Sequence, residues 1–198
     1  TATGIDVTGT ATMDGLTVDG TTGISVNGSY AVADLMETDI TDKNTRLITS
    51  GGEFRIDTLS DDKSSSTKRF DIEHSTGDIS FYEDTGTTAK FFWDASAESL
   101  GIGTSTPKTT LNLAANNSGQ GAILTLENSD TGITTNDVIG QIDFYANDGS
   151  TNGTGAKVNI KAIATSSAGT ITALTFGTSD SASATAVERL RIDASGNV

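Results

Sequence analysis

The stretch GDISFYEDTG at residues 77–86 recurs further along the chain as GQIDFYANDG at residues 140–149. In each copy apolar residues alternate with polar ones, and the copy ends in acidic, Asn and Gly residues. Alternation with a period of two is typical of a strand that buries one face, and Asp, Asn and Gly favour the turn that follows it. The two copies therefore predict two strands with the same role in two related parts of the chain.

A second match supports the same relationship: FFWDAS at residues 91–96 aligns with LRIDAS at residues 190–195. In this alignment Trp93 takes the place of an Ile, whereas Phe92 takes the place of Arg191. A position that accepts arginine is typical of a solvent-facing side of a strand. We therefore expect Trp93 to be buried in the core and Phe92 to be more exposed within its own chain.

Strand parity extends this assignment to the other aromatic residues. Phe91 shares the predicted core face with Trp93, since the two are two residues apart. Tyr82 and Tyr145 each come directly after a phenylalanine of the apolar face of their strand. They therefore point to the opposite face, as Phe92 does. We predict that Tyr82, Phe92 and Tyr145 form an outward or inter-chain aromatic surface, where inter-chain packing or stacking on a sugar would use them.

Short alternating runs separated by clusters of Ser, Thr, Gly and Asp fill most of the remaining sequence. This pattern predicts an all-β fold with mostly antiparallel pairing, because short connections join antiparallel neighbours. We expect two related antiparallel β modules, at residues 45–104 and 105–198. Between the N-terminus and these modules, residues 31–44 carry apolar residues near helical spacing, which predicts a connector with a short helix.

The N-terminal residues 1–30 repeat a shorter unit of glycine, two apolar residues separated by one polar residue, and a second glycine. The pattern predicts a β shaft built from short strands. The two apolar residues of one copy, which we call its anchors, bury too little apolar surface to offset the entropy of ordering the chain. Three chains around one axis supply both the apolar surface that covers these anchors and the hydrogen-bonding partners for the strand edges. We therefore expect an intertwined homotrimer whose axis is lined by Ile5, Val7, Leu16, Val18, Ile24 and Val26.

Composition excludes several classes of function. The chain has 26 acidic and 12 basic residues, a net charge of −14, which argues against a nucleic-acid partner and against binding to anionic membranes. It has no cysteine, which excludes disulfides, thiol chemistry and cysteine-ligated zinc. No apolar stretch approaches the roughly 20 residues that span a bilayer, so we expect no membrane insertion.

Catalytic and metal-binding patterns are missing from the sequence. His74 is the only histidine. Three carboxylate pairs could form a glycosidase pair: Asp61 with Asp62, Glu83 with Asp84, and Asp71 with Glu73, which share a strand face. Acidic residues are frequent enough for such pairs to arise from composition. The Asp-Gly pairs lack the regular spacing of calcium-binding loops. We therefore predict a non-enzymatic protein without metal or cofactor, with a polysaccharide depolymerase as the alternative.

Two stretches carry a resemblance to a known family. LGIGTSTP at residues 100–107 and ERLRIDASGNV at residues 188–198 resemble parts of the phrase R-I-D-x-x-G-N-V-G-I-G-T-x-x-P. This phrase recurs in tail fibre proteins of tailed bacteriophages, especially marine ones, where it often precedes a self-cleaving intramolecular chaperone. The match in motif covers only these two places, and self-cleavage carries over to no residue of this chain.

The resemblance implies an extracellular, homotrimeric β fibre on the virion tail. Its partners would be further copies of itself, other virion tail proteins, and a host surface glycan or protein. The implied function is structural: the segment spaces and presents a host-receptor-binding surface, and it belongs to a longer protein. Because the phrase also occurs in some bacterial surface proteins, a cellular adhesin or surface filament remains a second alternative.

Overall fold

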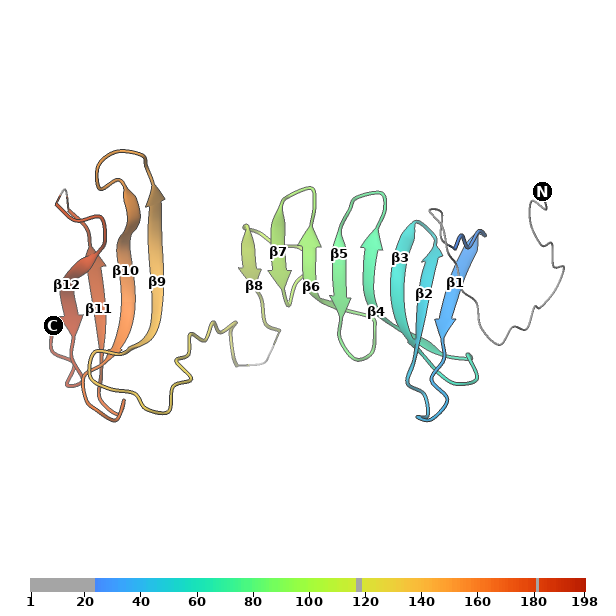
Figure 1. The fold of residues 1–198 in the computed structure, drawn as a ribbon, viewed down its shortest axis with the longest axis horizontal. Coiled ribbons are helices and arrows are strands. Elements are labelled where there is room, and N and C mark those ends of the chain that lie inside the picture. Colours follow the sequence, from blue (N-terminus) through green and yellow to red (C-terminus); the bar gives the residue numbers. More distant parts are fainter. Residues whose placement is uncertain (1–23, 117–118, 181) are drawn as a thin grey trace. The chain divides into compact units, whose positions relative to one another are not determined.

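The computed structural model describes residues 24–116, 119–180 and 182–198, and every regular element in these ranges is a β-strand (Figure 1). The chain divides into two units, Thr1–Ala122 and Ile123–Val198, each containing one sheet. The prediction of an all-β fold is therefore confirmed. Of the predicted axis anchors, those from Ile5 to Val18 lie outside the described residues, and Ile24 and Val26 are exposed and precede the first strand.

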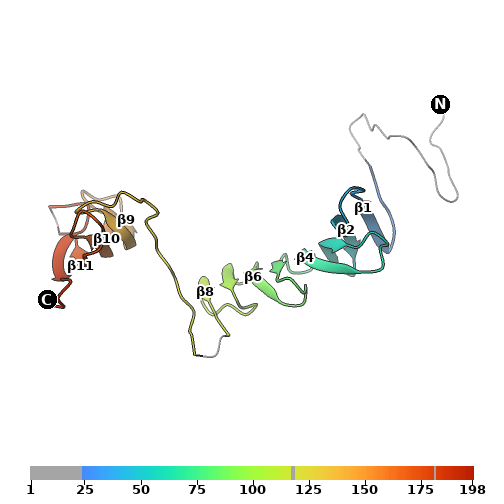
Figure 2. The same ribbon diagram turned by 90° about the horizontal axis from the view of Figure 1, so that it is seen from below.

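The first unit is an eight-stranded sheet in which each strand lies beside the next one along the chain. Neighbouring strands are antiparallel except the last two, β7 and β8, which are parallel. Seen from below, the strands form a single layer (Figure 2). The strands are β1 (Tyr30–Leu35), β2 (Asn44–Ser50), β3 (Glu53–Leu59), β4 (Ser66–Glu73), β5 (Ile79–Tyr82), β6 (Ala89–Asp94), β7 (Ser99–Ile102) and β8 (Leu111–Leu113).

Turn chemistry explains the hairpin that β2 and β3 form. The loop between β2 and β3 is Gly51-Gly52, and both residues have positive φ, 64° and 89°. Two consecutive positive φ values are what a two-residue hairpin of the primed type requires, and glycine adopts them without steric cost. The hairpin register follows from this turn, with Ser50 opposite Glu53 and Ile48 opposite Arg55.

The second unit is a four-stranded antiparallel meander in the order β12-β11-β10-β9. Its strands are β9 (Val138–Asn147), β10 (Thr154–Ala164), β11 (Thr172–Thr178) and β12 (Val187–Ile192). Irregular pairing interrupts the register between Ala156 and Val158 of β10 and between Phe176 and Gly177 of β11. Few hydrophobic side chains are buried in the described residues of the two units: Ile48, Leu59, Ile163, Ala164 and Ala173.

The predicted helix in residues 31–44 is wrong. Tyr30–Leu35 form β1, which pairs in full register with β2, so that Val32 lies opposite Ile48 and Leu35 opposite Thr45. The apolar spacing of this segment fits both a helix and a strand, and a short run of this kind cannot be assigned from its periodicity. Pairing with β2 determines the outcome because it satisfies the backbone of both strands.

The first unit extends beyond the predicted end of its module at residue 104. β8 lies at Leu111–Leu113 and pairs with β7, with Leu100 opposite Leu111 and Ile102 opposite Leu113. The division between the two units falls after Ala122. The stretch LGIGTSTP therefore belongs to the first sheet as β7 and the crossover that brings the chain back beside it.

Two glycines of the first unit test this packing. A Cβ at Gly103 (φ 79°) would collide with the carbonyl oxygen of Ala114, whereas a Cβ at Gly51 (φ 64°) would meet no atom within 4 Å. Left-handed strain alone costs roughly 1–2 kcal/mol for a non-glycine residue. We expect Gly51→Ala to lower the free energy of unfolding by about this amount and Gly103→Ala to lower it by clearly more.

Urea-induced unfolding of both variants beside the parent protein would measure the difference. Equal losses for the two glycines would contradict the close approach of β7 and the segment that follows β8.

Candidate functional site

The two faces of the first sheet differ in chemistry because its strands alternate and pair in register. Side chains at every second position share a face, and register aligns these positions across the sheet. We call the apolar side the ladder face, and the opposite side, where charged groups pair, the ion-pair face. The ladder face comprises Leu47, Phe54, Ile56, Phe70, Ile72, Ile79, Phe81, Phe91, Trp93, Leu100, Ile102, Leu111 and Leu113.

Four phenylalanines from four consecutive strands form the centre of the ladder face. The ring centroids of Phe54 and Phe70 lie 6.4 Å apart, those of Phe70 and Phe81 5.1 Å, and those of Phe81 and Phe91 5.2 Å. The outer two pairs are edge-to-face and the middle pair is tilted, which are the arrangements that the ring quadrupole favours. A continuous aromatic row therefore crosses β3 to β6, perpendicular to the strands.

A second apolar row runs beside the first. Ile79 pairs with Ile72 on one side and with Trp93 on the other, and Trp93 pairs in turn with Leu100, which lies opposite Leu111. Both rows stay partly open to solvent, and the exposed fraction is 47% for Phe81, 37% for Phe91 and 55% for Leu111. At the β1–β2 end, Val26, Leu47 and Phe54 line a shallow hollow of about 140 Å³.

On the ion-pair face, Lys68 connects two carboxylates. Its Nζ lies 2.8 Å from Asp71 and 3.0 Å from Glu53, and it is 5.2 Å from the centre of the Tyr82 ring. The Tyr82 hydroxyl donates to the same Asp71 carboxylate at 2.9 Å. Burial and this bond to the carboxylate raise the pKa of Tyr82. Asp71, only 5% exposed, is thus held by a charged partner and a hydroxyl.

Two arginines complete the pairs on this face. Arg46 of β2 contacts both carboxylate oxygens of Asp34 at 2.6 and 2.9 Å, and Arg55 binds Asp57, which is 1% exposed, at 2.6 Å. The guanidinium of Arg46 lowers the pKa of Asp34 from 3.8 to about 2, and the bond to Asp57 raises the pKa of Arg55. Bidentate pairs of this kind are the stronger class of ion pair. The buried charges of this face are therefore partnered within the chain.

The structure puts the predicted surface residues on the face that parity gives. Tyr82 and Phe92 both lie on the ion-pair face, where Phe92 stands between Ser80 and Gly101 of the neighbouring strands. Tyr145 of β9 is 66% exposed. Of these three, Tyr82 is engaged by Asp71 and Lys68 and is half-buried, whereas Tyr145 presents most of its ring to solvent.

The expected difference in burial does not hold within one chain. Trp93 and Phe92 are both half-buried, and Phe91 is exposed. Parity assigned the faces, but burial of the ladder face needs a covering layer, and the described residues of the first unit form only one sheet.

The second unit has the same division into faces. Its apolar face includes Gly140, Ile142, Phe144, Val158, Ile160, Ala162, Leu174, Phe176, Leu190 and Ile192. Phe144 is 55% exposed, and Ile142 and Leu190 are 44% exposed. Leu124 and Leu126, which precede β9 without forming a strand, line a groove of about 260 Å³ with this face. The second sheet thus also leaves apolar side chains open to solvent.

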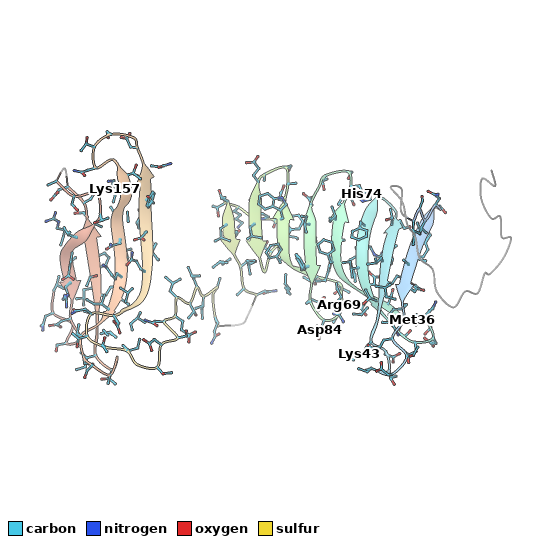
Figure 3. All side chains as sticks on the ribbon, viewed as in Figure 1. Met36, Lys43, Arg69, His74, Asp84 and Lys157 are labelled. Carbon is cyan, nitrogen blue, oxygen red and sulfur yellow. The ribbon has the colours of Figure 1, made fainter. Side chains whose placement is uncertain are left out.

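The candidate catalytic groups have structural partners. His74 follows the last residue of β4, at the end of that strand (Figure 3), and its backbone N–H donates to the carbonyl of Gly52 at 2.8 Å. Asp71 is paired with Lys68, and Glu73 accepts from the backbone N–H and hydroxyl of Ser75. In the described ranges there is no group of three or more His, Cys, Asp or Glu placed to hold a metal ion.

The ion pairs between strands were not predicted from the sequence. The signal available was the alternation of Glu53, Arg55 and Asp57 in β3, which puts three charges on one face. The contact of Glu53 with Lys68 depends on the pairing of β3 with β4, which the sequence does not specify.

No protein-family model matches the chain, and a search of curated proteins also found no match. Within the described residues, no helix is long and apolar enough to cross a membrane.

The Asp34–Arg46 pair predicts a specific pH dependence. A carboxyl with a lowered pKa in the folded state stabilises the fold above its ordinary pKa near 3.8, and this contribution is lost as the pH falls towards about 2. We expect Asp34→Asn to be less stable than the parent protein at neutral pH, because Arg46 loses its partner. Between about pH 5 and pH 2 the variant should lose less stability than the parent.

Urea titrations at several pH values would measure both effects, with the exposed Asp39→Asn as the matched control. The prediction fails if the two variants show the same pH profile.

Proposed function

We propose that the chain is a structural, non-catalytic segment of a bacteriophage tail fibre, which assembles as a homotrimer and spaces and presents a host-receptor-binding surface. The two motif stretches that resemble tail fibre proteins suggest the family. The observation that carries the proposal is that the described residues of each unit form a single sheet with an apolar face open to solvent. A stable domain normally packs two layers around a core, so a second layer has to come from association.

The polar features of the chain fit the same role. On one face of the first sheet, Arg46, Arg55 and Lys68 form ion pairs, and the two most buried carboxylates, Asp57 and Asp71, both have cationic partners. A depolymerase would need two carboxylates free to act on a glycosidic bond. In the pair of Asp71 and Glu73, one of three that the sequence offered, the carboxylates are instead held by Lys68 and by the turn at Ser75. One carboxylate of each other pair is also engaged locally: Asp62 accepts from Ser60 and Ser64, and Glu83 accepts from Thr85 and Thr88.

The oligomeric state tests the proposal directly. Light scattering coupled to size exclusion should give the mass of three chains of 20.3 kDa at micromolar concentration. Each copy carries a net charge of −14, so moderate salt should strengthen association by screening the repulsion. A monomer that unfolds cooperatively at the same concentration would contradict the proposal.

A further inference from the structure

We propose that copies of this chain pack against one another through the ladder face, with the fibre axis parallel to the aromatic row and perpendicular to the strands. The inference rests on the proposed function and specifies its interface. It makes residues 30–113 a continuous part of the shaft, in which each strand is one step along the axis. The ion-pair face then points outward.

The chemistry of the two faces decides which one is covered. The rows of the ladder face contain no charged side chain, so burying them costs no desolvation of charge. The opposite face contains Arg46, Arg55 and Lys68 in pairs that are already complete within the chain. Covering that face would remove water from charged groups without supplying new partners.

The size of the ladder face fits an interface between folded chains. Strands lie about 4.8 Å apart, so the seven gaps between eight strands give a length of roughly 34 Å. About five residues per strand, at about 3.3 Å each, give a width of roughly 17 Å. The flat area is therefore roughly 600 Å², the upper end for an apolar patch on a monomer and close to the roughly 800 Å² that one partner contributes to a standard interface.

A second copy of the chain is the occupant that this face fits. The partner must offer an uncharged apolar surface of the same length, and the ladder face of a second copy is such a surface. The paired charges of the ion-pair face would lose water without gaining new partners if two copies met there, which leaves the uncharged face as the one that can approach its equivalent. Phe81 and Phe91, near the middle of the strip and partly exposed, would be the central contacts.

The direction of the apolar rows on the ladder face determines the direction of the fibre axis. The ladder face is about twice as long as it is wide, and its in-register apolar positions run along the long direction, from Ala33 of β1 to Leu113 of β8. Sheets that share such rows around a common axis keep them in contact along their full length only if the axis is parallel to the rows. Equivalent residues of the copies then lie at the same level along the axis.

The absence of cysteine allows a clean test in the full chain. Phe91→Cys and Phe92→Cys differ by one position, carry the same change, and lie on opposite faces of β6. After treatment with a short bis-maleimide, Phe91→Cys should yield covalent dimers on a denaturing gel, because equivalent side chains meet at one level. Phe92→Cys should remain a single chain under the same conditions.

Quenching of Trp93 by acrylamide provides a second measurement on the unaltered protein, since Trp93 is the only tryptophan and lies on the ladder face. Quenching should be weak in the assembled protein and should rise when dilution separates the copies. If light scattering shows a trimer but Phe91→Cys does not cross-link, or Phe92→Cys cross-links equally, or Trp93 quenching does not change on dissociation, the ladder face is not the interface and the proposed function stands. A monomeric parent protein would overturn both.

Discussion

The in-register pairing of alternating strands is the constraint on which the first sheet depends, and a bulge in β4 maintains it. Phe70 pairs with Ile56 and Lys68 with Asp57, so the backbone of Arg69 between them is left out of the register with β3. If Arg69 paired regularly instead of forming a bulge, Lys68 would fall on the ladder face with Phe70 and would lose Asp71 and Glu53. Arg69 reaches the carbonyl oxygens of Glu83 and Asp84 instead (Figure 3). The bulge at Arg69 thus keeps the aromatic row apolar and the ion pairs together.

Alternation in the sequence was sufficient to predict the all-β class and the opposite directions of Phe92 and Trp93. It was not sufficient to predict burial, because exposure depends on a covering layer as well as on parity. The helix predicted for residues 31–44 is wrong for a related reason. Their apolar spacing is compatible with a helix, and only the pairing of β1 with β2 shows that Ala31 and Ala33 belong to one face of a strand. Long-range pairing is a property of the whole chain, which a local pattern does not contain.

The ion pairs of the ion-pair face also could be predicted only in part from the sequence. Glu53 and Asp57 could be read from the sequence as neighbours on one face of a strand, but their cations come from different places. Arg55 lies between them in β3, whereas Lys68 is contributed by β4 through its bulge. A pattern of alternating charges therefore indicates that a face is polar, and the register determines which charges neutralise each other. The same register gives Asp71 of the candidate pair Asp71 and Glu73 a cationic partner, Lys68.

The proposed axis has a mechanical consequence. Force along a row perpendicular to the strands acts in the direction of the backbone hydrogen bonds, so a lone meander would open one strand pair at a time from its end. Side-chain contacts between copies connect each strand to its equivalents at the same level, and a strand can then leave only if several apolar contacts break together. The ring contacts within each chain couple neighbouring levels in the same way. A single-layer sheet can therefore be stiff along this direction when its aromatic row is shared, and its ion-pair face needs no partner to remain in water.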